Sequence, residues 1–113
     1  MRQRDPAKAV EVLDLLLEFF ADGALWLQRG FHDPEDGSRC LVSALNHVRR
    51  KHGITGDGTG FYLLEIMPQR AKHLIEFNDT CRDFGELRAG LTLARAMALL
   101  DWRRRRERER LAA

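Results

Sequence analysis

Cysteine, proline and aromatic residues are scarce in this chain of 113 residues, which has two cysteines, three prolines and 8% aromatic residues. Cys40 and Cys81 match neither a disulfide framework nor a paired CxxC metal motif, so we expect free thiols and a cytoplasmic location. Apolar runs are short, and none approaches the ~20 residues needed to cross a bilayer. The basic amino end, residues 1–6, leads into an acid-punctuated stretch and not into the apolar segment of a signal peptide. The sequence therefore predicts neither a membrane span nor a disulfide.

The composition that remains is that of one globular domain, with 44% hydrophobic and 32% charged residues. A chain of this length can bury one core but not two. Charge is concentrated at the carboxyl end: residues 102–113 hold six arginines and two glutamates, a local charge of +4, so the other 101 residues sum to −2 within a total of +2. We therefore predict a single helical domain, residues 1–102, followed by an arginine-rich helical extension, residues 103–113.

The first helix has a clear start and a wide apolar surface. Asp5 is a good N-cap, and Pro6 suits the first helical position, where its missing N–H costs nothing. A stripe of acidic residues at helical spacing follows, and apolar residues fill the rest of the circumference. This arc predicts a helix that is contacted on more than one side and that ends at Gly23.

Dense turn chemistry at residues 33–37 precedes a second predicted helix, from about Arg39 to His52. Ser38 stands in its N-cap position, and Gly53 closes it. Its narrow apolar seam consists of Leu41, Ala44, Leu45 and Val48. The glycine-rich connector that follows, residues 55–60, lacks the flanking strand and the Lys-Ser/Thr pair of a phosphate-binding loop, so we expect a plain loop.

The second half of the chain predicts a broken helix followed by a long one. Pro68 interrupts an apolar stretch, so a third helix should be kinked or restarted there. Residues 78–80 are turn-forming, and Asp83 with Glu86 three positions later has the spacing of a capping box. The buried stripe predicted for the last helix comprises Leu87, Leu91, Ala94, Ala98 and Trp102, widened by Leu93, Met97 and Leu100. The fold class is therefore all-α, a compact bundle of four or five helices.

Cys40 has the clearest chemical potential, because a position in the first turn of the second helix beside Arg39 favours a thiolate. A cysteine-dependent hydrolase or transferase would also need His73 as the base and Asn78 or Asp79 to orient it. The alternative is structural, with Cys40 as a small buried residue and Asn78 and Asp79 as capping or turn residues. Residue statistics favour the structural alternative, so no catalytic residue is assigned.

Metal and cofactor sites are not expected. The histidines and cysteines lack the short ligand spacing of zinc sites; they are His32, His47, His52, His73, Cys40 and Cys81. Trp26 and Trp102 are expected at the edges of the core, since no basic and aromatic residues interleave around them.

The carboxyl-terminal arginines are the main candidate for a binding surface, because dense arginine can neutralise phosphates or acidic groups. They are Arg103, Arg104, Arg105, Arg106, Arg108 and Arg110. The competing interpretation is a solvated helix end, since Glu107 and Glu109 lie at helical spacing from arginines and cations interact favourably with a helix C-terminus.

Several short motifs occur in a recognisable order: Trp26, Gln28 and Gly30, then residues 39–45 (Arg-Cys-Leu-Val-Ser-Ala-Leu), then residues 77–79 (Phe-Asn-Asp). The pattern resembles an uncharacterised family of small all-helical bacterial and phage proteins with Trp-x-x-Gly, Cys-x-x-Gly-Ala-Leu and Trp-Asn-Asp motifs. Ser43 and Phe77 depart from it, standing where that family tends to have Gly and Trp. The resemblance implies a shared helical fold and no reaction.

Two functions are compatible with these patterns. The first is a small non-enzymatic interaction or regulatory module that binds an acidic protein or nucleic acid through its basic C-terminal helix. The second is a cysteine-dependent hydrolase or transferase that uses Cys40. Homodimerisation through the apolar surface of the first helix is compatible with either.

Overall fold

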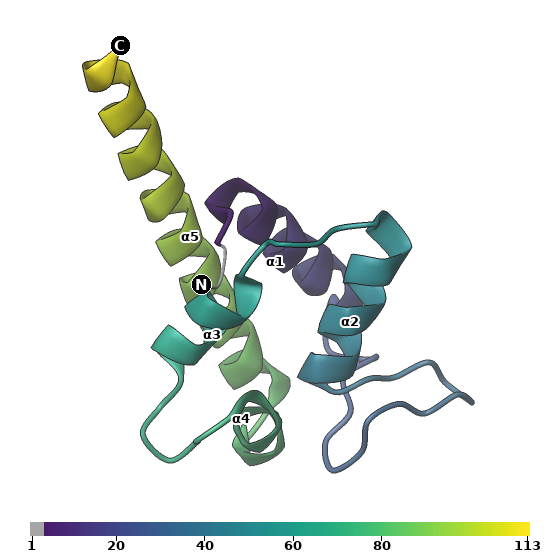
Figure 1. Ribbon diagram of the computed structural model, residues 1–113. Helices are drawn as coiled ribbons and strands as arrows, with labels where there is room; N and C mark the ends of the chain where they lie inside the picture. Colours follow the sequence, from purple (N-terminus) through teal and green to yellow (C-terminus); the bar gives the residue numbers. More distant parts are fainter. Residues whose placement is uncertain (1–3) are drawn as a thin grey trace.

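In the computed structural model, which describes residues 4–113, the chain folds into five helices joined by loops (Figure 1). They are α1 (Pro6–Phe20), α2 (Leu41–His52), α3 (Thr59–Ile66), α4 (Leu74–Thr80) and α5 (Phe84–Ala112). No strand forms among these residues; there are only isolated β-bridges from Arg39 to Trp26 and to His32. The predicted all-α class is confirmed. Residues 1–3, part of the basic amino end noted in the sequence, lie outside the described residues.

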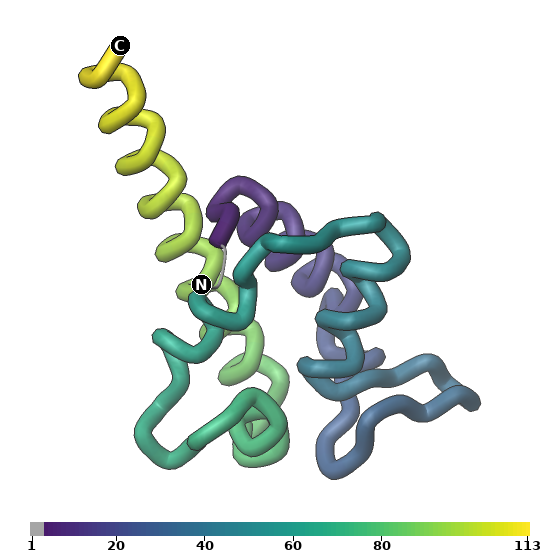
Figure 2. Tube along the Cα trace, in the orientation of Figure 1, coloured from purple at the N-terminus to yellow at the C-terminus, as the bar shows by residue number. Residues whose placement is uncertain are grey.

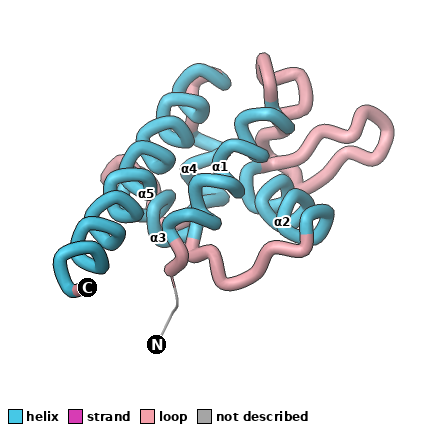
Figure 3. The backbone as a smooth tube through the Cα atoms, turned by 90° about the horizontal axis from the view of Figure 1, so that it is seen from above, coloured by secondary structure: helices cyan, strands magenta, loops and turns pink. Residues whose placement is uncertain are grey.

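Helix α1 lies at the centre of the bundle, where it packs against α5, α2 and α3 (Figure 3). It begins as predicted, because the Asp5 carboxylate accepts a hydrogen bond from the N–H of Lys8 and Pro6 opens the first turn. Its fully buried residues are Ala9, Val12, Leu13, Leu16 and Phe20. Most of the apolar surface that could have served homodimerisation is therefore covered within the chain.

The end of α1 corrects the sequence prediction. The helix stops at Phe20, and Ala21 adopts a positive φ of 48° at the start of a turn. Gly23 lies inside that turn with a φ of 99°, and a Cβ there would come within 2.7 Å of the Phe84 ring. This glycine serves a left-handed backbone and a close approach to α5 instead of the helix cap, which is why the predicted boundary was wrong.

The start of α2 is a second correction. Its N-cap is Cys40, whose Sγ accepts a hydrogen bond from the N–H of Ser43, and the predicted cap Ser38 lies in the preceding loop. Arg39 is held in an extended conformation because its N–H donates to the carbonyl of Leu25 and its carbonyl accepts from the N–H of Leu27. Because the backbone of Arg39 is bonded to residues 25 and 27, the helix begins two residues later than predicted.

Two other helix ends follow their sequence signals. At the carboxyl end of α2, Gly53 is left-handed with a φ of 62°, and the N–H of Ile54 donates back to the carbonyl of Arg49. At the start of α5, the Asp83 side chain accepts from the N–H of Glu86. Both predicted caps are confirmed.

The proline-containing segment separates α3 from α4, which confirms the broken third helix. Helix α3 begins inside the connector that was predicted to be a plain loop, because the carboxylate of Asp57 accepts from the N–H and the hydroxyl of Thr59. Residues 78–80, predicted as a turn, form the last part of α4. Phe77 of α4 packs onto Gly90 of α5, where a Cβ would lie 2.9 Å from the ring. This glycine lets the two helices approach closely.

Helix α5 begins in the bundle and extends beyond it at its carboxyl end (Figure 2), which gives the molecule an elongated outline of 52 × 31 × 27 Å. Its buried residues are Leu87, Leu91, Ala94 and Ala98. Leu93 and Leu100, predicted to widen this stripe, are exposed. The prediction was wrong because the other helices cover only one side of α5.

Candidate functional site

Asn78 is fully buried in α4, and its side chain joins three segments of the chain. Its Oδ1 accepts hydrogen bonds from the N–H of Leu41 at 3.0 Å and from the indole N–H of Trp26 at 2.8 Å. Its Nδ2 donates to the carbonyl of Leu27 at 2.9 Å and to Oδ1 of Asp79 at 3.0 Å. The side chain thus makes two bonds as donor and two as acceptor, which is its full capacity.

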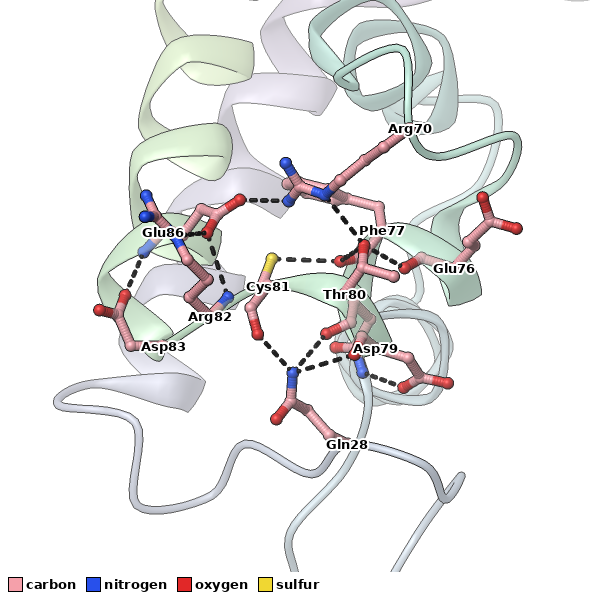
Figure 4. Close-up of polar contacts among 11 residues, drawn as sticks. Gln28, Arg70, Glu76, Phe77, Asp79, Thr80, Cys81, Arg82, Asp83 and Glu86 are labelled. Carbon is pink, nitrogen blue, oxygen red and sulfur yellow. Dashed lines mark hydrogen bonds and ion pairs between the residues drawn. The ribbon is translucent and has the colours of Figure 1, made fainter.

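Gln28 binds the carboxyl end of α4 (Figure 4). Its Nε2 donates to the carbonyl of Cys81 at 2.7 Å and to the carbonyl of Asn78 at 3.1 Å. The last carbonyls of a helix have no partner within the helix, so this amide acts as a C-terminal cap. Asp79 adds a further link, because its Oδ1 accepts from the N–H of Arg29 at 2.9 Å.

We call Trp26, Gln28, Asn78 and Asp79 the Asn78 junction. Its contacts are those of a structural cluster, because the polar atoms of Asn78 are occupied by bonds within the chain. Among the described residues, no buried side-chain nitrogen or oxygen lacks a hydrogen-bond partner. The prediction of a turn at residues 78–80 was wrong because the side chains of Asn78 and Asp79 bond to segments distant in the sequence.

Of the residues in the catalytic hypothesis, Cys40 and Asn78 lie near each other, but within the described chain neither is hydrogen-bonded to His73. Cys40 is 3% exposed, and its Sγ accepts from the N–H of Ser43 at 3.5 Å. His73 is the exposed N-cap of α4, with its Nδ1 accepting from the N–H of Glu76 at 3.1 Å. Asn78 adjoins Cys40 through its bond to the N–H of Leu41. Within residues 4–113, no hydrogen bond joins His73 to Cys40 or Asn78.

Cys81 lies at the carboxyl end of α4 and is buried (Figure 4). Burial, with a smaller effect of the Glu86 carboxylate, raises the pKa of the Cys81 thiol to about 11. Its Sγ donates to the carbonyl of Phe77 at 3.1 Å. Cys81 is therefore a protonated, hydrogen-bonded thiol at neutral pH.

An ion pair with a buried carboxylate, between α2 and α3, was not predicted from the sequence. Asp57 is 1% exposed, and its carboxylate accepts from Arg49 Nη2 at 2.8 Å and from Thr59 Oγ1 at 2.5 Å. Burial alone would raise the pKa of Asp57, but the bonds from Arg49 and Thr59 outweigh it and hold that pKa below its ordinary value. An aspartate two residues before a threonine could have indicated the side-chain bonds at the start of α3. The bond to Arg49 depends on the turn that reverses the chain after α2.

Metal ligands do not gather in the part of the chain that the structure describes: no group of three or more histidine, cysteine, aspartate or glutamate side chains could hold an ion there.

We call residues 103–112 of α5 the arginine end. Five of its arginines are exposed, namely Arg103, Arg104, Arg106, Arg108 and Arg110. Arg105 faces the body of the molecule, where it donates to the carbonyl of Arg4 at 3.0 Å and lies 3.7 Å from the carboxylate of Asp101. The six arginines are therefore not equivalent, because one of them tethers the helix to the amino end.

The exposed arginines have few partners. Arg106 lies 5.0 Å from the centre of the Trp102 ring, and Arg110 pairs with Glu107. Arg103, Arg104 and Arg108 make no hydrogen bond or ion pair with residues 4–113. Most of the positive charge here is not neutralised by the rest of the described chain, which distinguishes the arginine end from the Asn78 junction and from the Asp57 pair.

Comparisons with known protein families, with curated proteins and with solved structures find no match. The resemblance to small helical bacterial and phage proteins therefore stays a prediction. Within residues 4–113, no helix is both long enough and apolar enough to cross a bilayer. The geometry leaves the arginine end as the candidate functional site.

Proposed function

We propose that this protein is a small non-enzymatic interaction module that binds nucleic acid through the arginine end of α5. The main support is a row of exposed arginines, Arg103, Arg106 and Arg110, on one side of the helix. At 3.6 residues per turn, the three positions lie within about 60° of one another and span about 10 Å along the axis. One strand of duplex DNA presents about three phosphates over that length.

Two further arginines favour nucleic acid over an acidic protein. Arg104 and Arg108 lie on another side of the helix, about 150° from the first row. A helix in the major groove has phosphate backbones on both sides, whereas an acidic protein surface faces one side of a helix. The carboxyl end of α5 extends beyond the bundle, so it can enter a groove without the other helices following it (Figure 1).

We propose a non-enzymatic function because the residues of the catalytic hypothesis have structural contacts. Cys40 is buried as the N-cap of α2, and the side chain of Asn78 has no unused polar atom. Both cysteines are buried free thiols, which a reducing compartment would preserve. We propose the cytoplasm as the location on that basis.

The test is a triple substitution, Arg103→Gln, Arg106→Gln and Arg110→Gln, assayed for binding to duplex DNA and duplex RNA across a salt series. The matched control removes three exposed positive charges elsewhere: Arg50→Gln, Lys51→Gln and Lys72→Gln. We expect the arginine-end variant to bind at least about tenfold more weakly and to lose about 2–3 from the slope of log K against log salt, because three phosphate contacts are removed.

The control should keep most of the affinity of the natural chain and its salt slope. Equal losses in the two triple variants would mean that net charge and not the arginine row drives binding. If the natural chain binds polyglutamate but neither nucleic acid at low salt, the partner is an acidic protein and the nucleic-acid proposal fails.

A further inference from the structure

A row of side chains at heptad spacing runs along α5, and all of them are exposed except Met97, which packs against the core. The row consists of Leu93, Met97, Leu100, Arg104, Glu107 and Leu111. Steps of four and three residues keep these positions on one side of the helix, as the a and d positions of a coiled coil are. Its leucines are 52%, 47% and 72% exposed at Leu93, Leu100 and Leu111. We call this set the open row; it comprises three of the six large apolar side chains found exposed in the described chain.

We propose that the part of the open row from Leu100 to Leu111 binds the same part of a second copy of this chain, in antiparallel orientation, about a twofold axis between positions 105 and 106. In this register Leu100 packs on the partner's Leu111, and Arg104 faces the partner's Glu107. The twofold axis repeats both contacts, so two leucine pairs flank two pairs of opposite charge. Each a position then meets a d position, as antiparallel packing of two heptad faces requires.

The residues beside the open row fit the same register. On one edge, Asp101 lies opposite the partner's Arg108; within its own chain Asp101 also accepts from the Tyr62 hydroxyl at 2.5 Å and lies 3.7 Å from Arg105. On the other edge, Arg103 lies opposite the partner's Arg110, and four arginines of the two copies gather there. The pairing thus places its attractive charges at the centre and on one edge, and it concentrates positive charge on the other edge.

The parallel arrangement lacks this complementarity. It would set Arg104 against the partner's Arg104 and Glu107 against the partner's Glu107, and like charges in contact oppose association. In the antiparallel arrangement the two bodies lie at opposite ends of the paired helices, because the carboxyl end of α5 extends beyond the bundle (Figure 2). The chain's own charges therefore select one orientation.

This inference goes beyond the proposed function and does not depend on it. The nucleic-acid proposal uses Arg103, Arg106 and Arg110, whereas pairing uses Leu100 and Leu111 with Arg104 and Glu107. The test measures mass without nucleic acid, so either proposal can fail alone.

The experiment is sedimentation equilibrium of the full chain up to a few hundred micromolar. We expect the natural chain to approach about 26 kDa, twice the 13.0 kDa of one copy. Arg104→Glu and Glu107→Arg should each weaken association by about tenfold or more, because each sets like charges against each other twice. The double variant Arg104→Glu with Glu107→Arg should recover dimers, and so should an equimolar mixture of the two single variants, because both restore opposite charges across the pair.

Arg106→Glu and Glu109→Arg are the matched controls, because they make the same charge changes on the same helix outside the open row. They should keep the mass of the natural chain. Circular dichroism checks that every variant folds, which is expected since all four side chains are exposed. A natural chain that stays at 13.0 kDa, or a double variant that does not recover dimers, would overturn the proposal.

Orientation is tested separately with Leu100→Cys and Leu111→Cys. Under mild oxidation, a mixture of the two single variants should form a disulfide between copies, because positions 100 and 111 face each other. Each variant alone should form little, since equal positions lie about 8 Å or more from the axis along the helices. Strong crosslinking of either variant alone, with none added by mixing, would show a parallel pair and overturn the antiparallel register.

Discussion

The body of this protein, residues 4–102, and its arginine end differ in how their polar groups are satisfied. In the body, Asn78 and Asp57 are buried, and their side chains bond to other parts of the chain. In the arginine end, Arg103, Arg104 and Arg108 make no hydrogen bond or ion pair with the described residues. Burial without a partner is costly, whereas a solvated charge needs none. The fold therefore explains the polar residues of the body, and it leaves those of the arginine end available to a partner.

The energetics of the arginine end support the same distinction. Arg104 and Arg108 lie four residues apart on the helix, as do Arg106 and Arg110, and like charges at this spacing destabilise a helix. The pair of Arg110 with Glu107 is exposed, so it contributes little. These like-charge spacings are unfavourable within the helix, which supports the proposal that the arginine end binds a partner.

The largest expected effect comes from removing the side chain of Asn78, at the centre of the Asn78 junction. Asn78→Ala should destabilise the fold by about 3–4 kcal/mol, because it leaves the indole N–H of Trp26 and the N–H of Leu41 without their partner and also removes two donated bonds. Urea unfolding followed by circular dichroism measures this change.

Asn46→Ala is the matched control, since Asn46 is the other asparagine and makes no hydrogen bond through its side chain within residues 4–113. It should change stability by less than about 0.5 kcal/mol. Similar losses in the two variants would remove the special role of the junction.

The thiols of the body should react slowly. With a pKa of about 11, Cys81 has about 200-fold less thiolate at pH 8 than an ordinary thiol, and burial slows access further. Cys40 should also be slow, because it is 3% exposed. Labelling with a thiol-reactive probe, with and without urea, measures both rates. Rapid labelling of Cys40 in the native protein would instead support the cysteine-dependent enzyme hypothesis.

The buried ion pair should contribute less than the junction and should depend on pH. Asp57→Asn should cost about 2 kcal/mol at pH 7, because it weakens charge-assisted bonds to Arg49 and Thr59. Since the pKa of Asp57 is lowered in the folded state, its contribution is complete above the ordinary carboxyl range and is lost as pH falls through the folded-state pKa.

The difference in urea stability between the natural chain and Asp57→Asn should therefore shrink below about pH 4. A difference that stays constant from pH 7 to pH 3 would contradict the assigned pKa direction.

Removal of the arginine end should have the smallest effect on folding. A chain that stops after Trp102 loses the contacts of Arg105 with the carbonyl of Arg4 and with Asp101, and that of Arg106 with the Trp102 ring, but no buried residue. We expect it to fold with a loss below about 1 kcal/mol, measured by urea unfolding. A loss as large as that of Asn78→Ala would show that the arginine end belongs to the body.

Local signals predicted much of the fold. The caps at Asp5, Gly53 and Asp83 and the break at Pro68 are where the sequence predicts them, because each depends on bonds or backbone limits within a few residues. The boundaries at Gly23 and Ser38 were wrong. In both places the backbone conformation is set by a segment distant in the sequence or by packing against another helix, and local propensity does not contain that information.

The candidate sites divide in the same way. The arginine end can be recognised from the amino-acid composition alone, because its charge does not depend on any contact. The roles of Asn78 and of the leucines at 93 and 100 were not predictable from local patterns. Asn78 bonds to residues 37 to 52 positions away, and those leucines were predicted to be buried because periodicity gives the width of an apolar stripe without giving how much of it neighbouring helices cover.

The sequence by itself determined that the protein is all-α, where several helices begin and end, and that positive charge collects at residues 103–110. These properties arise from interactions within a helical turn or from charge, which need no partner. Only the tertiary structure decided that Asn78 joins α4 to α2, that Cys40 is a helix cap and that one side of α5 stays open. Those outcomes depend on which segments meet in space, and this is set by packing the whole chain around one core.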